Sequence, residues 1–564
     1  MHYKEAYQQW LEMFKGDEKT YNELLSIKDD EEEIKDRFYT DLAFGTAGMR
    51  GVIAAGRNRI NIYSIRRATQ GFADYILSTG TGAPVAIGYD SRRFSKEFAL
   101  ETALVLSANG IKALLFDALR PVALLSFAVR HYACAAGVVI TASHNPSAYN
   151  GYKAYWSDGA QLPPEPAAAV TECINKLPYD GARLISEQDA LASGLLEYIG
   201  PELDEAYYKM VLGLSIRPEA GLERGGDISI VYTPLNGSGN VPVVEVLKRA
   251  GFTRVFTVKE QQQPDPDFTT VGVPNPENKE AFKLALELAD RKNADLVFAT
   301  DPDCDRVGVA VKTSGGEYVL LTGNQIGVLL AHYIMSGLKE KNALPQNGAI
   351  VKSIVSTDMV NIIAEDFGVA VIDVLTGFKF IAEKIQEFEE SGRYSFLFGF
   401  EESFGYLSGK DVRDKDGVNA SLLLAECALM HKEAGRSLHE GLEQIYDRYG
   451  WCTENICSID FPGAEGQVNM ARAMSGLRGN PPREIGGVRV TSVTDYLGNI
   501  PGFTKSNVLF YRLEGGSWVC VRPSGTEPKV KLYVNCMAKE RPEAERLLPL
   551  ISSDASEMLS NAIG

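Results

Sequence analysis

The sequence predicts an α/β protein of several domains that ends in a smaller α+β domain. The chain has 564 residues, which at about 150 residues per domain is enough for about four domains. From about residue 41 to 450, short β-branched runs alternate with helical patterns, as in α/β domains with parallel or mixed sheets. Beyond about residue 450, strands follow one another near Pro- and Gly-rich stretches, and a closing helix is expected at 544–560.

Composition and charge narrow the classes of function. Hydrophobic residues make up 45% and charged residues 23%, which is typical of a globular protein. The 57 Lys and Arg against 74 Asp and Glu give a net charge of −17, which disfavours nucleic acid or an anionic membrane as a partner. Eight cysteines without a Cys-x-x-Cys pair indicate a reducing compartment. Neither an apolar leader nor a membrane-spanning run occurs, so we expect a cytoplasmic protein.

The segment 1–40 is expected to form a helical extension with a structural role. Tyr7, Trp10, Leu11 and Phe14 fall at the i, i+3, i+4, i+7 spacing that places them on one face of a helix. The acidic run at 29–33 is expected to be a solvated helix face.

Strands and helices then alternate along the chain. We expect strands at 84–88, 137–140, 228–232, 295–299 and 349–355, helices at 96–108 and 241–250, and further strands at 488–490 and 518–521. The segments 85–91, 228–239 and 354–358 share a strand, a polar turn and the start of a helix. This weak repeat is suggestive of a triplicated α/β unit.

The polar run Thr-Ala-Ser-His-Asn-Pro at 141–146 is a first candidate site, because it follows the expected strand 137–140. Ligands of α/β proteins bind beyond the carboxyl ends of strands, so Ser143 is well placed to be a nucleophile. Thr141 and Asn145 stand where the Gly-x-Ser-x-Gly elbow of hydrolases requires glycine, which excludes that motif. Lys153 adds a cation downstream, and a plain polar turn is the alternative interpretation.

A second candidate is Asp-Pro-Asp-Cys-Asp-Arg at 301–306, between two apolar runs. Asp301, Asp303 and Asp305 repel one another unless a cation lies among them, and carboxylate oxygens suit Mg²⁺ or Ca²⁺. An EF-hand is excluded, because Arg306 and Lys312 stand where that loop requires Gly and Glu. With three protein ligands, Mg²⁺ needs water or a phosphoryl oxygen to complete its coordination. An acidic surface turn is the alternative.

Two further polar loops suit a sugar phosphate. Glu401, Glu402 and Ser403 stand among glycines at 399–405 and can hydrogen-bond sugar hydroxyls, although an ordinary loop has the same composition. The run Arg-Pro-Ser-Gly-Thr-Glu-Pro-Lys at 522–529 combines an arginine fork with hydroxyls and a glycine, which suits phosphate. It is not a Walker A loop, and a tight hairpin is the alternative. Together the four clusters indicate phosphoryl transfer on a sugar phosphate.

These motifs, in this order, resemble those of the α-D-phosphohexomutase superfamily, and within it the phosphoglucomutase and phosphomannomutase group. The likeness runs from Gly-Thr-Ala-Gly-Met-Arg-Gly at 45–51 to Arg-Pro-Ser-Gly-Thr at 522–526. It implies four domains around a central cleft, namely three related α/β domains and a last, TATA-binding-protein-like α+β domain. The expected segments are the extension 1–40, domain I at 41–205, domain II at 206–322, domain III at 323–450 and domain IV at 451–564.

The resemblance also implies a role for each site residue. Ser143 is implied to be a phosphoserine whose phosphate completes a Mg²⁺ site formed with Asp301, Asp303 and Asp305. Around the transferring phosphate it places Arg50, His144, Lys153 and Arg306, with His144 or Lys153 as the general base. The residues implied to contact substrate are Arg306, Lys379, Glu401, Ser403, Lys415, Arg522, Ser524, Gly525 and Thr526.

The implied enzyme is an isomerase, an intramolecular phosphotransferase that interconverts glucose 1-phosphate and glucose 6-phosphate through glucose 1,6-bisphosphate. Its implied partners are small sugar phosphates, and it would be a monomer or a homodimer. The form Glu-Glu-Ser-Phe-Gly at 401–405 favours glucose, whereas Phe400 and the long amino-terminal segment keep phosphomannomutase and phosphopentomutase as alternatives. A non-catalytic sugar-phosphate-binding protein is a remote alternative, because Ser143 and the three aspartates are present.

Overall fold

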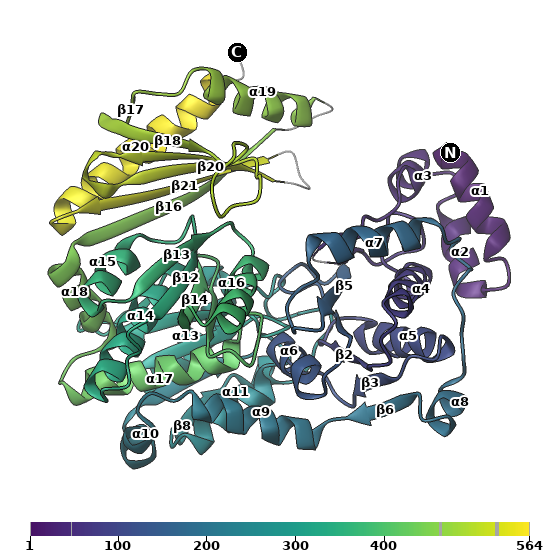
Figure 1. The fold of residues 1–564 in the computed structure, drawn as a ribbon, viewed down its shortest axis with the longest axis horizontal. Helices are drawn as coiled ribbons and strands as arrows, with labels where there is room; N and C mark the ends of the chain where they lie inside the picture. Colours follow the sequence, from purple (N-terminus) through teal and green to yellow (C-terminus); the bar gives the residue numbers. More distant parts are fainter. Residues whose placement is uncertain (1, 47, 462–464, 525–528, 563–564) are drawn as a thin grey trace.

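The computed structural model describes residues 2–46, 48–461, 465–524 and 529–562 (Figure 1). The amino-terminal segment forms three helices, as its apolar spacing predicts: α1 (Tyr3–Met13), α2 (Glu18–Ser26) and α3 (Glu31–Phe38). The Trp10 ring packs edge to face on Phe38, with centroids 5.8 Å apart, and on Tyr179 at 4.8 Å. The extension is therefore attached to the neighbouring α/β unit through its apolar face, while Asp29 to Glu32 are exposed.

The first α/β unit is built on a six-stranded sheet with the order β1-β5-β4-β2-β3-β6. Strands β2, β3 and β4 are buried along their whole length, which is the pattern of strands covered by helices on both faces. Its elements are β1 (Met49–Val52), α4 (Ile62–Ser78), β2 (Val85–Tyr89), α5 (Ser95–Ala108), β3 (Ala113–Phe116), α6 (Val122–His131), β4 (Ala136–Ile140), β5 (Tyr149–Trp156), α7 (Pro164–Asn175), α8 (Glu187–Ala192) and β6 (Leu196–Ile199).

The second α/β unit has a five-stranded sheet with the order β11-β10-β9-β7-β8. The helices α9 (Pro201–Gly213) and α10 (Pro218–Arg224) lead into it from the first unit. Its remaining elements are η1 (Gly225–Asp227), β7 (Ser229–Thr233), α11 (Asn240–Arg249), β8 (Arg254–Thr257), α12 (Lys259–Gln262), η2 (Lys279–Phe282), α13 (Lys283–Lys292), β9 (Leu296–Thr300), β10 (Val307–Lys312) and β11 (Tyr318–Leu320).

The third α/β unit has a four-stranded sheet with the order β13-β12-β14-β15. The strand expected at 349–355 ends at Ser353, because Ile354 and Val355 turn away from the sheet and pack against aromatic side chains of the carboxyl-terminal unit. The elements are α14 (Gly323–Glu340), β12 (Gly348–Ser353), α15 (Met359–Phe367), β13 (Ala370–Val374), α16 (Phe378–Ser391), β14 (Ser395–Glu401), β15 (Gly405–Ser408), α17 (Gly417–Glu433) and α18 (Leu438–Tyr449).

The three α/β units repeat one four-stranded core. In each, the first strand is flanked in parallel by the second and the third, and the fourth pairs antiparallel with the third. These cores are β2-β3-β4-β5, β7-β8-β9-β10 and β12-β13-β14-β15. The weak repeat in the sequence therefore corresponds to a repeat of topology, although the segments outside the cores differ.

The fourth unit is a six-stranded antiparallel sheet with the order β16-β21-β20-β19-β18-β17. Along β20, Val519 and Val521 face a core shared with two helices, whereas Trp518 and Cys520 pack with residues of the third unit. Its elements are β16 (Trp451–Asp460), α19 (Gly466–Gly479), β17 (Glu484–Ile485), β18 (Val488–Asp495), β19 (Leu509–Leu513), η3 (Glu514–Gly516), β20 (Trp518–Pro523), β21 (Lys529–Ala538) and α20 (Arg541–Asn561).

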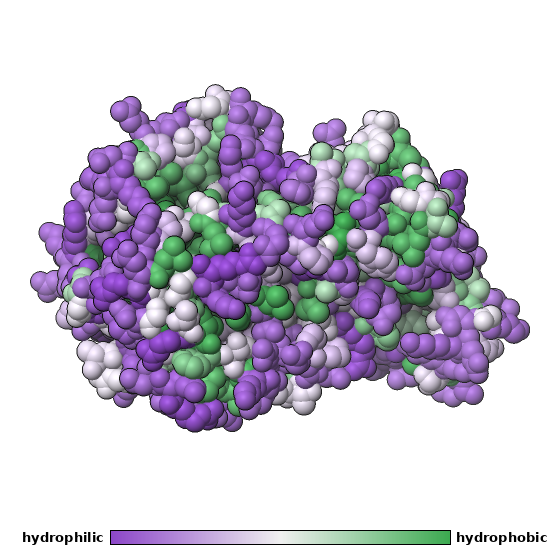
Figure 2. Space-filling view, turned by 90° about the horizontal axis from the view of Figure 1, so that it is seen from below, coloured by the Kyte–Doolittle hydropathy of each residue, from purple (hydrophilic) through white to green (hydrophobic). Residues whose placement is uncertain are grey.

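The outer surface is mostly polar. On the face shown in Figure 2, hydrophobic residues are interspersed among hydrophilic ones. Among the described residues, no helix combines the length and the apolar character that crossing a bilayer requires.

Candidate active site

Three of the candidate clusters lie in one recurring turn, between the third and fourth strands of the repeated core. Ser143 follows β4, the three aspartates follow β9, and Glu401 ends β14. Each turn holds a residue other than glycine in the left-handed region: Ser143 at φ 52°, Cys304 at φ 53° and Phe404 at φ 66°. Such a conformation costs about 1–3 kcal/mol, and it persists where the surrounding structure enforces it, often at functional sites. Its recurrence in the three loops points to a constraint on their shape.

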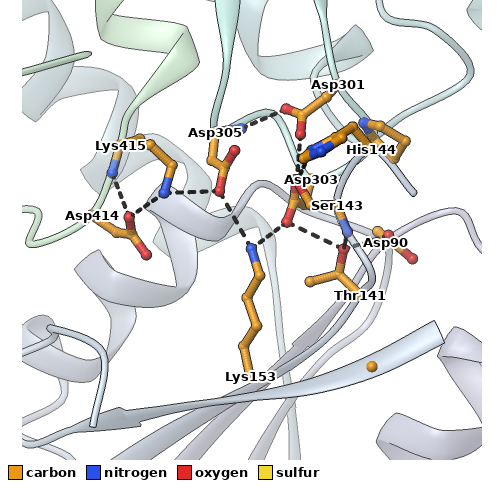
Figure 3. A network of polar contacts seen from close by, with 12 residues as sticks. Asp90, Thr141, Ser143, His144, Lys153, Asp301, Asp303, Asp305, Asp414 and Lys415 are labelled. Carbon is orange, nitrogen blue, oxygen red and sulfur yellow. Dashed lines mark hydrogen bonds and ion pairs between the residues drawn. The ribbon is translucent and has the colours of Figure 1, made fainter. Parts of the chain in front are cut away.

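Residues 141–149, which carry Ser143, form the nucleophile loop, and residues 301–306, which carry the three aspartates, form the metal loop. The two loops meet in a hydrogen-bond network (Figure 3). The Ser143 hydroxyl donates to Asp301 Oδ2 at 2.7 Å, and His144 Nδ1 lies 3.2 Å from the same Oγ. Thr141 Oγ1 accepts from the backbone N–H of Ser143 at 2.8 Å and donates to Asp90 Oδ2 at 2.6 Å. The serine expected to be the nucleophile thus contacts an aspartate expected to bind metal, although they belong to different units.

The three aspartates have the arrangement of a divalent-cation site. Asp301, Asp303 and Asp305 are buried, and each offers a carboxylate oxygen within 4.8 Å of the others. Asp303 Oδ1 and Asp305 Oδ1 are buried oxygens without a hydrogen-bond partner. An unpaired buried oxygen is costly, and converging carboxylates are the ligands that Mg²⁺ prefers. The residues present therefore fit Mg²⁺.

Two lysines from different units offset the charge of the aspartates. Lys153, on β5, places Nζ 2.7 Å from Asp303 Oδ2 and 3.3 Å from Asp305 Oδ2. Lys415, in the loop before α17, places Nζ 3.2 Å from Asp305 Oδ2 and 2.9 Å from Asp414 Oδ1. Both lysines are buried, so these pairs are poorly screened by water. They hold the first and third units against the metal loop.

The buried charges shift the pKa values of the site. Burial and the repulsion of Asp303 and Asp305 raise the pKa of Asp301 well above its usual range. Burial also acts to raise the pKa of Asp305, but Lys415 and Lys153 outweigh it and hold that pKa below its ordinary value. Burial, aided by nearby arginines, lowers the pKa of His144 to about 2. The His144 imidazole is therefore neutral near pH 7. Because the Ser143 hydroxyl donates its proton to Asp301, the 3.2 Å contact corresponds to the tautomer in which His144 Nδ1–H donates to Ser143 Oγ.

The predicted cations outside this network stand around it. Arg50 Nη1 donates to Asn145 Oδ1 at 2.9 Å, which places it beside the nucleophile loop. Arg306 donates its backbone N–H to Asp301 Oδ1 at 3.0 Å, and its guanidinium pairs with Glu277. Lys379, at the start of α16, donates from Nζ to Thr46 Oγ1 at 3.0 Å and so joins the third unit to the beginning of the first.

Residues 399–405 form the third loop, which we call the sugar loop. Its two glutamates contact different partners. Glu401 Oε1 accepts from the backbone N–H of Gly377 at 2.6 Å, and Glu402 Oε2 accepts from Ser353 Oγ at 2.9 Å. Burial, together with the charge of Glu401, raises the pKa of Glu402 to about 7. Ser403 is half-buried in the same turn.

The fourth loop belongs to the fourth unit. Arg522 is near the end of β20 and Ser524 follows that strand, whereas Gly525 and Thr526 lie outside the described residues. The charge of Arg522 opposes the rise in the pKa of Glu402, which places the two side chains near each other between the third and fourth units. The structure thus brings together Ser143, the three aspartates and the two lysines. Arg522 lies beside the sugar loop.

Sequence reasoning missed several residues that shape the site. Arg92 and Asp90 lie in the polar turn after β2, which was recognised only as a structural turn. Asp414 precedes Lys415, which was singled out through the family resemblance, and it accepts from Lys415 and from the hydroxyl of Tyr155 at 2.8 Å. The available signal was position: each follows or precedes a core element at the same edge of a sheet as the four clusters.

Comparisons with known proteins agree with this arrangement. Models of the phosphoglucomutase/phosphomannomutase family match its alpha/beta/alpha domain I at residues 41–180, domain II at 205–316, domain III at 322–449 and the C-terminal domain at 477–549. A phosphoglucomutase from Staphylococcus haemolyticus is 38% identical over 510 residues, covering 88% of this chain and 91% of the relative. One from Staphylococcus aureus is 37% identical over 523 residues, covering 89% and 91%.

Solved structures share the fold over most of the chain. A putative phosphomannomutase from Thermus thermophilus is 25% identical and superposes with a TM-score of 0.69, covering 92% of this chain and 99% of the other. The open form of parafusin from Paramecium, named there as a phosphoglucomutase, is 17% identical with a TM-score of 0.72, covering 93% and 95%.

Proposed function

The chain belongs to the phosphoglucomutase/phosphomannomutase family, and from this premise we propose that it is a phosphoglucomutase, which interconverts glucose 1-phosphate and glucose 6-phosphate. It is an isomerase that moves a phosphoryl group within one sugar. The observation that carries the proposal is the contact of the Ser143 hydroxyl with Asp301, 2.7 Å away, in a buried triad of aspartates. This contact supports the proposal, because a hydroxyl that could accept a phosphoryl group lies beside residues that fit a divalent cation.

The reaction needs two transfers through Ser143. Phosphorylated Ser143 gives its phosphoryl group to the free hydroxyl of the hexose phosphate: the bond from Ser143 Oγ to phosphorus breaks, and a bond from the sugar oxygen forms. The resulting bisphosphate reverses its orientation in the site and returns its other phosphoryl group to Ser143. Mg²⁺ held by Asp301, Asp303 and Asp305 would neutralise charge on the phosphoryl oxygens when bound.

The chain's own side chains supply the remaining requirements. Lys153 and Lys415 carry positive charge to the edge of the triad, where it offsets the charge that develops on transferring oxygens. A base must accept the proton of the attacking sugar hydroxyl. His144, neutral and 3.2 Å from Ser143 Oγ, is the candidate for this role. Burial acts to lower the pKa of Lys153, but Asp303 and Asp305 outweigh it and raise that pKa, so Lys153 is protonated and serves as a cation.

The choice of glucose rests on two supports. Relatives at 38% and 37% identity are named phosphoglucomutases, and Glu401 and Ser403 stand in the Glu-Glu-Ser-Phe-Gly form associated with glucose. The Arg522 loop, beside the sugar loop, would hold the phosphate that is not being transferred. Phosphomannomutase and phosphopentomutase activities are the alternatives that the assay below must separate.

The test is a coupled assay of the purified protein with Mg²⁺ and glucose 1-phosphate, mannose 1-phosphate or ribose 1-phosphate, each with its bisphosphate. We expect the highest kcat/KM with glucose 1-phosphate. Ser143→Ala removes the phosphoryl acceptor, so turnover should fall by at least about a thousandfold without loss of fold. Ser147→Ala, in the same loop, is the matched control and should retain its rate. A wild-type rate for Ser143→Ala would exclude the assignment, and a preference for another sugar would replace it.

A further inference from the structure

Arg92 lies behind the nucleophile loop, in the turn after β2, and its side chain has no exposed surface. Every N–H of its guanidinium donates to a backbone carbonyl of that loop. The bonds run from Nε and Nη2 to Ser143 O at 3.2 and 2.5 Å, from Nη2 to Asn145 O, and from Nη1 to Pro146 O at 2.9 Å and Tyr149 O at 3.1 Å. One buried side chain therefore binds four carbonyls of the loop that carries the nucleophile.

This set of bonds determines the shape of the loop. Guanidinium is a planar fork whose five donors have fixed directions, so four carbonyls bound to one fork are held at fixed relative positions. One of them is the carbonyl of Ser143 itself, whose φ of 52° is unfavourable for a residue with a side chain. Because Arg92 binds the peptide that follows this residue, it resists relaxation of Ser143 to an ordinary conformation, which would turn Oγ away from Asp301.

Asp90, which lies in the same turn as Arg92, holds the other end of the nucleophile loop. Asp90 Oδ1 accepts from the backbone N–H of Arg92 at 2.9 Å, and Asp90 Oδ2 accepts from Thr141 Oγ1 at 2.6 Å. Thr141 Oγ1 in turn accepts from the N–H of Ser143. The peptides on both sides of Ser143 are thus fixed by residues of a single turn.

A residue of the second unit covers the guanidinium. The Arg92 guanidinium carbon lies 5.0 Å from the ring centroid of Phe268, which is fully buried. Next to it, Arg93 pairs with Asp267, so the segment around 267–268 sits directly on this turn. The same unit supplies Asp301, the acceptor of the Ser143 hydroxyl. The unit that bears the metal loop therefore contacts the side chain that shapes the nucleophile loop.

We propose that Arg92 is a positioning residue for phosphoryl transfer: it holds Ser143 in the left-handed conformation that directs Oγ to Asp301, and Phe268 ties this hold to the unit that carries the metal loop. The inference rests on the proposed function for its kinetic readout. Arg92 does not contact the reacting atoms, and it acts through the backbone of the loop. A purely structural role would instead lower stability without changing turnover.

The test compares four variants. Arg92→Met removes all five donors, Arg92→Lys keeps the charge without the fork, and Phe268→Leu removes the ring. Arg67→Met is the matched control, because Arg67 is also a largely buried arginine of the first unit, bound to Asp41 at 2.8 Å and to Leu177 O at 2.8 Å.

We expect kcat to fall at least about a hundredfold in Arg92→Met, about tenfold in Arg92→Lys and about threefold in Phe268→Leu, since small misplacements of a nucleophile have effects of this size. The KM for glucose 1-phosphate should stay within about twofold, because the site that binds sugar phosphate is untouched. Arg67→Met should lower the thermal midpoint and leave kcat within about twofold.

Amide hydrogen exchange of residues 141–149 gives a readout that needs no mutase activity. Faster exchange confined to this loop in Arg92→Met supports the proposal, even if the wild-type protein converts no sugar phosphate and the proposed function fails. Unchanged exchange in the loop, or a wild-type kcat with a lowered thermal midpoint, overturns it. If Arg92→Met does not fold, Arg92→Lys and Phe268→Leu decide: lowered kcat with faster loop exchange supports the proposal, and wild-type values in both overturn it.

Discussion

The metal loop of the second unit and the sugar loop of the third unit occupy the same place in the repeated core, yet they handle negative charge in opposite ways. Both lie between the third and fourth strands, and both hold one residue in the left-handed conformation, Cys304 in one and Phe404 in the other. In the metal loop, three carboxylates converge within 4.8 Å. In the sugar loop, Glu401 and Glu402 diverge to separate hydrogen-bond donors.

The difference follows from the spacing of the acids. Asp301, Asp303 and Asp305 alternate along the chain and turn to one side, where two lysines and a cation can balance them. Glu401 and Glu402 are adjacent at the end of a strand, where successive side chains point to opposite faces. The turn after the third strand of the core therefore forms a candidate cation site in the second unit. In the third unit, the equivalent turn directs its two carboxylates to separate neutral donors. The same position in the core supports both, because the number and the spacing of the acids differ between the two loops.

The largest effect is expected in the metal loop. Asp303→Asn keeps an oxygen but removes a charge, so we expect kcat to fall about 100- to 1,000-fold, the usual size for losing transition-state stabilisation. Chelation of wild-type protein should stop turnover, and added Mg²⁺ should restore it. Asp290→Asn, an exposed acid on α13 of the same unit, is the control for kcat. Full activity in excess chelator would contradict the distinction drawn between the two loops.

A smaller effect is expected at Arg522, which lies beside the sugar loop and which we propose binds phosphate. A charge-assisted hydrogen bond contributes about 1.5–3 kcal/mol, so Arg522→Ala should cost roughly ten- to a hundredfold in kcat/KM. Much of the loss should appear in KM, because this contact binds the phosphate that is not being transferred. Measuring KM and thermal midpoint on one variant separates the roles: an unchanged KM with a lower midpoint would assign Arg522 to a structural hairpin.

The smallest effect on turnover, and a distinct effect on stability, is expected at Glu402. Its pKa is raised from 4.5 to about 7 by burial and by Glu401, so the folded state binds the proton more tightly than the unfolded chain. Stability from this group is therefore present below the unfolded pKa and declines as pH rises toward 7, by an amount on the order of 1–3 kcal/mol.

Glu402→Gln removes this titration and keeps an acceptor for Ser353. Relative to wild type, the variant should gain thermal stability between about pH 5 and about pH 8, where only the wild-type side chain loses its proton. Thermal midpoints of both proteins at the two pH values measure the effect. A difference between the proteins that does not depend on pH would show that Glu402 is ionised throughout this range.

Much of the fold was predictable because its signals are local. The apolar spacing of Tyr7, Trp10 and Leu11 predicted the first helix, and continuous apolar runs predicted β2, β4 and β9 within one residue at each end. The strand expected at 349–355 ended early because Ile354 and Val355 pack against a sheet far along the chain, which no local pattern indicates. Predictions at Gly525 and Thr526 lie outside the described residues.

The amino-acid sequence by itself determined which chemistry is available: a serine beyond a buried strand, three alternating aspartates and an arginine fork among hydroxyls. Only the tertiary structure decided which of these meet. Ser143 and Asp301 are 158 residues apart, and Lys153 and Asp303 are 150 apart, so neither contact follows from spacing or propensity. The contacts exist because three copies of one core pack with their equivalent turns facing one another. For the same reason the sequence of the turn that holds Arg92 is that of an ordinary loop. Only the fold brings the five donors of the Arg92 guanidinium to the carbonyls behind Ser143.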